Sequence, residues 1–445
     1  MSEAIIEIIK NFSDNFLEKI KNNKVHIISH YDVDGITSLA IISKTLKKLN
    51  IQFSTKIIKT LTNEEIDIIP KDKIILLLDM GSSSLDILSE CNDPERIFII
   101  DHHEPQIIEN LKLNFLNPHL TGIENFCSAE LTYLFAISIS EENKNLAYLA
   151  ILGMVGDLME IEINKIRKQI ISDANIEVRK GLLIYPSTRP LDKALEFSSR
   201  PLIPGVTGNY SGVLQLLNEA GIEKIGKKFK SLIDLDDKEM KSLTTTIMLR
   251  LHSKDISEYI GNLYLIKLFN RIEDARELTA MINACSRMGK SETALLLCLG
   301  NNEARKKAER LYIKYRQEII SGLRYIEKNG NIYGKGYIII NTKNNIKDTL
   351  IGTLASILSF SPIYEEGTII IAMAYNDKDI KVSARVAGRN SHRNLKEVMD
   401  YIISCLGRGI SGGHKYAAGC TINMEDEKRF IESAQRYLEY ETIKV

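Results

Sequence analysis

The chain has 445 residues, 44% of them hydrophobic, which suffices for two or three domains that each bury a core. Its 58 basic and 58 acidic side chains cancel, so no overall positive field attracts nucleic acid, and any such binding must use a local groove. The six cysteines include no Cys-x-x-Cys pair, which argues against a zinc ribbon or an iron–sulfur site and indicates reduced core residues.

The amino-terminal 23 residues show an amphipathic helix pattern with several acidic side chains, which is unlike a signal sequence. No apolar stretch approaches the ~18 residues that a membrane span requires. We therefore expect a soluble, cytoplasmic protein with no membrane partner.

Strand and helix patterns alternate through the first third of the chain, which is typical of a doubly wound parallel sheet. Residues 36–49 are expected to form its first crossover helix. Short apolar runs predict strands at residues 25–29, 51–58, 74–78 and 97–100. The sequence thus predicts an α/β catalytic domain over residues 1–165.

Metal-binding types of side chain follow three of these strands directly. In open α/β sheets, ligand sites collect at the carboxyl ends of the strands, so these side chains are expected to meet at one edge. Asp157 arrives at the end of an apolar helix pattern over residues 146–155, where Gly153 and Gly156 allow close approach. The candidate residues at this edge are His30, Asp32, Asp34, Asp79, His102, His103 and Asp157.

Each of these segments also has an ordinary structural explanation. An Asp after a strand, such as Asp79, usually caps a helix or forms a turn, and Asp32 to Gly35 could be a plain strand-to-helix turn. Two adjacent histidines at a strand end have no such routine use. Carboxylate and imidazole together suit Mn, Mg, Fe or Zn, and two such ions can activate water and neutralise charge on a phosphoryl oxygen. The combination therefore predicts a two-metal phosphoesterase.

The middle of the chain is helical and charged, with a Pro-, Gly- and Ser-rich break at residues 185–211, a helical insertion at 210–251 and a long connecting helix at 301–328. We expect this helical region to span residues 166–330. Strand patterns return at residues 336–341, 368–374 and 379–386. They predict a second, smaller α/β domain over residues 331–445.

A glycine-rich segment at residues 407–419 is the most informative part of that domain. Glycines let backbone N–H groups approach a phosphate, and His414 with Arg408 or Lys415 could complete an anion pocket, although turns use glycines too. His26 and His119 are expected to be structural.

The order His-x-Asp-x-Asp-Gly, Asp, Asp-His-His, Asp and Gly-Gly-His-x-x-Ala-Ala-Gly resembles the DHH phosphoesterase superfamily with its DHHA1 domain, and in particular the RecJ-like exonucleases. The resemblance covers nearly the whole chain. It implies two Mn²⁺ ions, with Mg²⁺ as an alternative, bridged by Asp79. The implied ligands are His30, Asp32 and Asp79 for one ion and Asp34, His102 and Asp157 for the other.

The resemblance also implies the contacts with substrate. His103 would face the scissile phosphate, so that Asp79, His103 and Arg287 are the implied catalytic residues. Asn283 and Arg287 lie in segment 277–289, which is similar to the RecJ segment near the substrate phosphates, except that Ser286 replaces the usual Gly. The implied nucleic-acid-binding residues of the carboxyl-terminal domain are Ser383, Arg385, Gly412, Gly413 and His414.

The leading hypothesis is an exonuclease that degrades single-stranded DNA or RNA to mononucleotides in DNA replication or repair. One alternative is a phosphoesterase of small substrates such as oligoribonucleotides, adenosine bisphosphate or cyclic dinucleotides, whose members usually lack the Asn-Ala-x-x-Arg segment. Another is a Cdc45-like replisome scaffold, which would be expected to lose metal ligands.

The chain is too short after Gly419 for the OB-type domain of bacterial RecJ, and it resembles archaeal RecJ-like proteins, including the GINS-associated nuclease. The helical insertion is then the expected docking site for a GINS-like protein.

Overall fold

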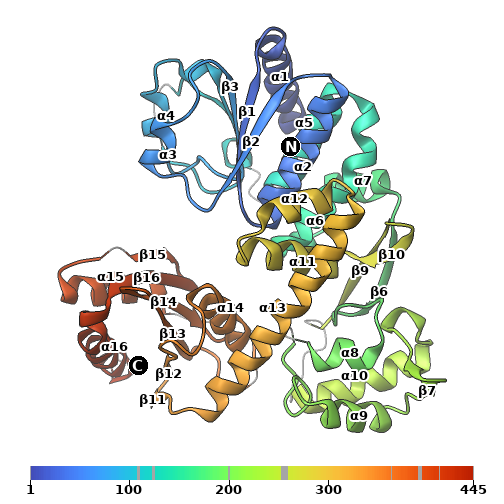
Figure 1. The fold of residues 1–445 in the computed structure, drawn as a ribbon, viewed down its shortest axis with the longest axis vertical. Helices are drawn as coiled ribbons and strands as arrows, with labels where there is room; N and C mark the ends of the chain where they lie inside the picture. Colours follow the sequence, from blue (N-terminus) through green and yellow to red (C-terminus); the bar gives the residue numbers. More distant parts are fainter. Residues whose placement is uncertain are drawn as a thin grey trace. The chain divides into compact units, whose positions relative to one another are not determined.

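The computed structural model divides the chain into two compact units (Figure 1). Unit 1 comprises Met1–Lys180 and Asn262–Ile313, and unit 2 comprises Gly181–Gly261 and Lys314–Val445. The predicted helical region at 166–330 is therefore shared between the two units. The structure describes residues 2–107, 111–122, 126–198, 201–251, 259–361, 363–388, 393–409 and 411–443.

Unit 1 is built on a five-stranded parallel sheet with the strand order β2-β1-β3-β4-β5. The strands are β1 (Val25–His30), β2 (Phe53–Ile58), β3 (Ile74–Leu78), β4 (Ile97–Ile100) and β5 (Asn114–Leu116). The predicted doubly wound α/β sheet is thus confirmed. Because β2 and β3 lie on opposite sides of β1, the strand order reverses there, and such a reversal opens a crevice at the carboxyl edge of a sheet.

Helices cover the sheet and bury apolar side chains against it. Phe12 and Phe16 on α1 (Ser2–Ile20) meet Phe98 and Phe135 edge to face, with ring centroids 5.1–5.4 Å apart. The remaining helices of unit 1 are α2 (Val33–Lys48), α3 (Asn63–Asp67), α4 (Leu85–Ser89), α5 (Ser128–Ile139), α6 (Ala147–Gly156), α7 (Lys165–Ala174), α11 (Ala275–Arg287) and α12 (Ser291–Cys298).

The later helices of unit 1 explain why residues 262–313 belong with the amino-terminal sheet. Helix α11 packs on α6, and α12 packs on α2. Leu278, Met281 and Ile282 of α11 are buried there. The chain passes from one unit to the other within β6 (Glu177–Leu182), β9 (Ile260–Leu268) and the long helix α13 (Asn302–Lys328). Strand β10 (Arg271–Asp274) belongs to unit 1.

Unit 2 contains a six-stranded mixed sheet with the order β11-β12-β13-β14-β16-β15, which confirms a second α/β domain. Its strands are β11 (Ile332–Gly334), β12 (Tyr337–Asn341), β13 (Ile369–Asn376), β14 (Asp379–Val386), β15 (Ser411–His414) and β16 (Ala417–Asn423). Its helices are α14 (Asp348–Ser359), α15 (Leu395–Leu406) and α16 (Glu427–Ile443). The predicted insertion at 210–251 forms α9 (Tyr210–Glu219), β7 (Lys224–Ile225), β8 (Lys228–Phe229) and α10 (Asp237–Leu251), and the break predicted at 185–211 contains a short helix, α8 (Leu191–Glu196).

The glycine-rich segment differs from the loop that we expected. Much of it is a β-hairpin, in which β15 pairs antiparallel with β16 and Gly412 lies opposite Gly419. Arg408 does not complete an anion pocket, because its guanidinium already forms ion pairs with Asp426, at 2.7 Å, and with Glu425.

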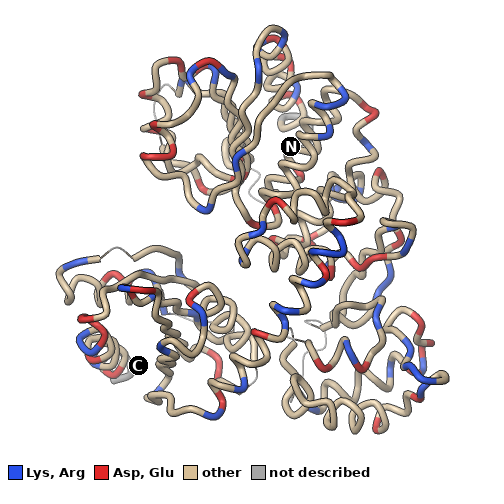
Figure 2. Tube along the Cα trace, in the orientation of Figure 1, with Lys and Arg blue, Asp and Glu red and all other residues tan. Residues whose placement is uncertain are grey.

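Basic and acidic residues are interspersed along both units (Figure 2). Within the described residues, no helix combines the length and the apolar character that crossing a membrane would need.

Candidate metal centre

The first part of the site is the turn that joins β1 to α2. His30 is the last residue of β1, and Asp32 caps α2 by accepting a hydrogen bond from the Gly35 N–H at 3.1 Å. A Cβ at Gly35 would lie 2.3 Å from the His30 carbonyl oxygen, so only glycine fits this turn. The turn therefore holds His30 and Asp32 side by side, 3.1 Å apart at Nδ1 and Oδ2.

Asp34 lies in the first turn of α2 and is fully buried. Its carboxylate accepts the backbone N–H groups of Ser128, at 2.6 Å, and Ala129, at 2.8 Å, which begin α5. A helix amino terminus favours a negative charge, so α5 fixes this carboxylate in place. A Cβ at Gly153 would lie 2.7 Å from Asp34 Oδ1, so the close approach expected at that glycine is present.

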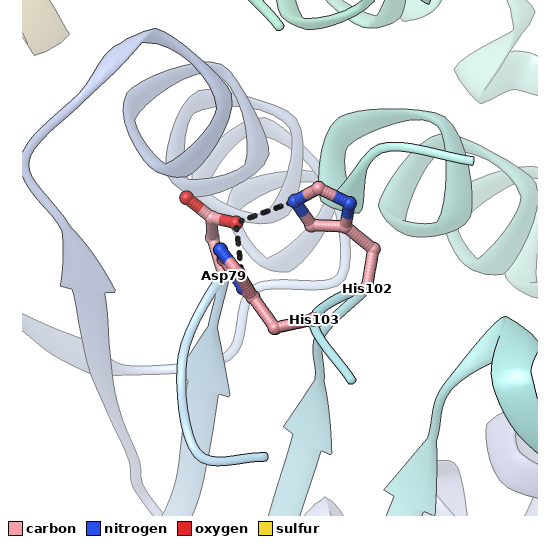
Figure 3. A group of neighbouring side chains, drawn as sticks. All are labelled: Asp79, His102 and His103. Carbon is pink, nitrogen blue, oxygen red and sulfur yellow. Dashed lines mark ion pairs between the residues drawn. The ribbon is translucent and has the colours of Figure 1, made fainter. Parts of the chain in front are cut away.

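Asp79 is the central residue, as Figure 3 shows with two of its neighbours. It follows β3 directly, is 2% exposed and has a left-handed backbone with φ of 60°. Its carboxylate lies 3.1 Å from His30 Nδ1, 3.5 Å from His102 Nε2 and 4.0 Å from His103 Nδ1. It also accepts a hydrogen bond from the Ser128 hydroxyl at 3.1 Å.

Asp101 positions the two histidines that follow it. Its carboxylate accepts the backbone N–H of Ser82 and that of His102, and it lies 2.7 Å from His103 Nδ1. Although burial acts in the opposite direction, the hydrogen bonds from His103 and Ser82 lower the pKa of Asp101 to about 2. The same hydrogen bond to Asp101 raises the pKa of His103, which favours a protonated ring with Nε2 left for another partner.

The structure brings the predicted ligands together. Asp157, at the end of α6, lies 3.3 Å from His102 Nε2. Three groups have ligand atoms that all lie within 4.8 Å of one another: His30, Asp32 and Asp79; Asp34, His102 and Asp157; and Asp79, His102 and His103. The first two groups coincide with the ligand sets that the resemblance implied for two ions.

The electrostatics of the cluster favour divalent cations. Burial, followed by repulsion from Asp32 and Asp34, raises the pKa of Asp79 well above its usual range. Burial and the charge of Asp34 do the same for Asp157. Carboxylates so close together repel each other unless cations lie between them. A donor set of carboxylate oxygens and imidazoles fits Mn²⁺ and accepts Mg²⁺.

Several supporting residues were not predicted from the sequence. The fully buried Arg167 on α7 forms a bidentate ion pair with Glu130 on α5, and it donates to the carbonyl oxygens of Met159 and Glu162. It thus fixes the chain just after Asp157. No local sequence pattern indicates this role, because Arg167 lies two helical elements after Asp157 in the chain.

The loop after β5 supports the histidine pair from its other side. Asn117 donates to the His103 carbonyl oxygen at 2.9 Å, and a ring nitrogen of His119 lies 3.1 Å from the His102 carbonyl oxygen. His119 is therefore structural, as expected. His26 is likewise engaged on the sheet, with Nδ1 2.8 Å from the Ser54 hydroxyl.

The predicted substrate contacts lie in both units. In unit 1, Asn283 is half-buried and Arg287 is exposed on α11, the helix that packs on α6. Ser286, which replaces the usual glycine, is buried. Among the described residues, Arg287 forms no ion pair. We call the residues of the three ligand groups the metal-type cluster: His30, Asp32, Asp34, Asp79, His102, His103 and Asp157. The structure shows neither Asn283 nor Arg287 in contact with this cluster, and their role stays a prediction.

In unit 2, the predicted residues line one open groove of about 500 Å³. Ser383 lies opposite Gly419, and Gly419 lies opposite Gly412, so two of three positions in this row across the sheet lack a side chain. The groove is lined by Ser383, Arg385, Gly412 and Gly413, with Lys381 as an addition that the sequence had not suggested. The side chain of His414 lies outside the described part of the structure.

Comparisons with known proteins place this architecture in one superfamily. Three family models match the chain: the DHH family, N-terminal domain, at residues 24–154, the DHH-CID domain at residues 184–263, and the DHHA1 domain at residues 334–440. Together these models cover most of the chain, which belongs to the DHH/DHHA1 superfamily and has a RecJ-like fold. The DHH-CID match falls on the insertion that we predicted.

Individual relatives agree with this membership. An uncharacterized protein of Methanocaldococcus jannaschii is 26% identical over an alignment of 457 positions that covers 97% of each chain. Exonuclease RecJ bound to manganese is similar in structure, with a TM-score of 0.62, 16% identity and coverage of 96% of this chain and 94% of that one. CDC45 from Entamoeba histolytica gives a TM-score of 0.69 at 12% identity over 98% of each chain. At these identities the two solved structures show a shared fold.

Proposed function

We propose that this protein is an exonuclease that uses two divalent metal ions, most simply Mn²⁺, to degrade single-stranded DNA or RNA to mononucleotides. The observation that carries the proposal is the pair of three-residue ligand groups at one sheet edge, each with all its ligand atoms within 4.8 Å. Ions held there would activate a water molecule and neutralise charge on the scissile phosphoryl group. RecJ, whose solved structure contains manganese, shares the fold.

Other side chains and backbone groups of the chain would bind the substrate. His103, held through Nδ1 by Asp101 and 57% exposed, would present its other ring nitrogen to a phosphoryl oxygen. Its raised pKa favours the protonated ring, which is the form that donates to an anion. Asn283 and Arg287 would bind phosphates in unit 1. In unit 2, Ser383, Arg385 and the backbone N–H groups of Gly412 and Gly413 would bind the strand, together with His414.

A Cdc45-like scaffold without catalysis is the second candidate, because CDC45 shares the fold. The complete set of metal-type side chains argues against it, since a scaffold gains nothing from four buried or half-buried carboxylates that repel one another. A phosphoesterase of small substrates would use the same cluster, and only its substrate would differ.

The decisive experiment is degradation of end-labelled single-stranded DNA and RNA with and without Mn²⁺. We expect mononucleotide release that depends on the metal and is lost in Asp79→Ala. Placing the label at each end of the strand in turn shows from which end the enzyme degrades it. Full activity of Asp79→Ala would exclude the metal assignment, and cleavage of dinucleotides alone would favour the small-substrate alternative.

We also propose that the DHH-CID region at residues 184–263 docks a GINS-like replisome protein, which would connect the nuclease to DNA replication or repair. Co-purification of the full chain with the GINS-like proteins of its source organism tests this. A variant that lacks α9 and α10 should lose the partner and keep the nuclease activity.

A further inference from the structure

A lysine and a tyrosine next to the metal-type cluster have no role in the function proposed above. Strand β2 runs parallel to β1, with Ile58 opposite His30. Tyr31 and Lys59, the residues that follow, therefore come to the same edge of the sheet on neighbouring strands. Lys59 Nζ lies 5.8 Å from the centroid of the Tyr31 ring.

The ring of Tyr31 is held but not buried. It stands nearly perpendicular to the His30 ring, at an interplanar angle of 83° and a centroid distance of 5.1 Å. The side chain is half-buried, whereas Tyr133 of the same unit is fully enclosed. Within the described residues the Tyr31 hydroxyl has no hydrogen-bond partner. A ring that one neighbour orients and solvent still reaches can accept a flat ligand on its face.

Lys59 supplies a cation that is not neutralised locally. It is exposed, and among the described residues no carboxylate lies within ion-pairing distance of its ammonium. Lys56, on the same strand, is instead paired with Glu65. The metal-type cluster near by contains four Asp side chains, whose negative charges repel an anionic substrate. The unpaired Lys59 ammonium lies outside these carboxylates and can bind such a substrate.

We propose that Tyr31 and Lys59 form a nucleotide subsite beside the scissile position. The Tyr31 ring stacks on the base of the nucleotide that is being removed, and the Lys59 ammonium binds a phosphate next to it. The proposal rests on the nuclease function proposed above. Stacking on an aromatic ring tolerates every base, because each base has a π face, and it gives nothing to a substrate without a base.

Such a subsite would determine which substrates the metal-type cluster acts on. Inorganic polyphosphate presents anionic phosphates, joined by anhydride rather than ester bonds, and has no bases, so it would gain from Lys59 alone. A single-stranded end gains from both residues. The pair would thus make the cluster select nucleotides over other phosphate esters, without selecting among the four bases.

The test compares a single-stranded oligonucleotide with the same strand carrying an abasic residue at its cleaved end. With the full chain and Mn²⁺, Tyr31→Ala should lower kcat/KM about tenfold on the normal strand, which is the usual effect of losing one stacked base. Tyr31→Phe, which keeps the ring, should lose much less. On the abasic strand, wild type and Tyr31→Ala should be equal.

Lys59→Ala should raise KM several-fold on both strands, and this effect should disappear when the neighbouring linkage is an uncharged methylphosphonate. Lys71→Ala is the matched control, because Lys71 is an exposed lysine that precedes β3, at the amino edge of the same sheet. It should leave kcat/KM unchanged. Equal losses for Tyr31→Ala on normal and abasic strands would overturn the stacking assignment.

Binding without turnover gives a second readout. Calorimetry should show that wild type binds a mononucleotide more tightly than the corresponding sugar phosphate, and that Tyr31→Ala removes the difference. The rise in melting temperature on adding Mn²⁺ should be the same in Tyr31→Ala and wild type. If Tyr31→Ala shows no such rise, Tyr31 belongs to the metal site instead. If wild type cleaves neither strand, the nuclease proposal fails, and the mononucleotide comparison still decides on the subsite.

Discussion

The two predicted substrate-handling regions are built on opposite principles. The metal-type cluster of unit 1 gathers charged side chains at strand ends, with Asp34 and Asp79 almost fully buried. The groove of unit 2 is open, and its most characteristic positions, Gly412 and Gly413, carry no side chain at all. Without bound cations the first region lowers the stability of the folded protein, because its carboxylates repel each other. The second offers backbone groups and two cationic side chains to an extended anion.

This contrast indicates a division of labour. A cluster of desolvated charges can stabilise a changing charge distribution, which is what catalysis requires. A groove of glycine backbone with cations binds a polyanion about equally before and after reaction, which contributes affinity rather than rate. Substitutions in the metal-type cluster should therefore act on kcat, and substitutions in the groove on KM.

The largest expected effect is that of Asp79→Asn on turnover. The change keeps the shape of the side chain and removes the charge of the carboxylate that belongs to two of the three ligand groups, so kcat should fall by roughly 10³-fold or more. Binding of a single strand should stay close to that of wild type, measured by fluorescence anisotropy. A variant that loses binding as well as turnover would break the contrast between the two regions.

Arg167→Met should give the largest effect on stability. It leaves the Glu130 carboxylate buried without its partner, which costs about 3–5 kcal/mol, or a melting temperature lower by about 10 °C. Lys144→Ala, which breaks an exposed ion pair with Glu141, is the control and should not change the melting temperature measurably. An equally small change for Arg167→Met would show that the buried pair does not support the cluster.

Arg385→Ala tests the groove. It removes a cation beside Ser383, so the affinity for a single strand should fall about tenfold, and the slope of log K against log salt should decrease by about 0.7. Turnover at saturating substrate should change little. Lys428→Ala, on the exposed side of α16, is the control for loss of a positive charge. A drop in kcat instead of affinity would place Arg385 in the chemistry.

The smallest expected effect concerns pH. The pKa values of Asp79 and Asp157 are raised in the folded protein, so their contribution to stability is present below about pH 4 and is lost as pH rises through the raised values. Metal-free wild type should therefore lose a few degrees of melting temperature between pH 5 and pH 8, and Asp79→Asn should lose less. Mn²⁺ should stabilise wild type more at pH 8 than at pH 5. The opposite trend would show that repulsion does not govern the cluster.

Much of the metal-type cluster could be predicted from the sequence because its positions are set locally. The runs at residues 74–78 and 97–100 are strands within the predicted bounds, and both end at the predicted acidic residues. Parallel strands place their carboxyl ends at one edge, so strand ends alone bring Asp79 and Asp101 together. Gly35 also follows from local need, since a Cβ there would overlap His30, whereas a Cβ at Gly153 would meet Ala129 and Asp34, which are distant in the chain.

The tertiary structure decided what depends on residues far apart in the chain. Asp34 accepts hydrogen bonds from the backbone N–H groups of Ser128 and Ala129, which are 94 and 95 residues away. No local sequence pattern predicts these contacts. Arg408 lies in a glycine-rich segment suited to anions, yet Asp426 neutralises it. Hydrophobic periodicity and strand ends are local properties of a sequence, whereas the partner of a charge depends on how distant elements pack. The sequence by itself therefore determined which side chains reach the edge of the sheet, and the packing decided which of them meet.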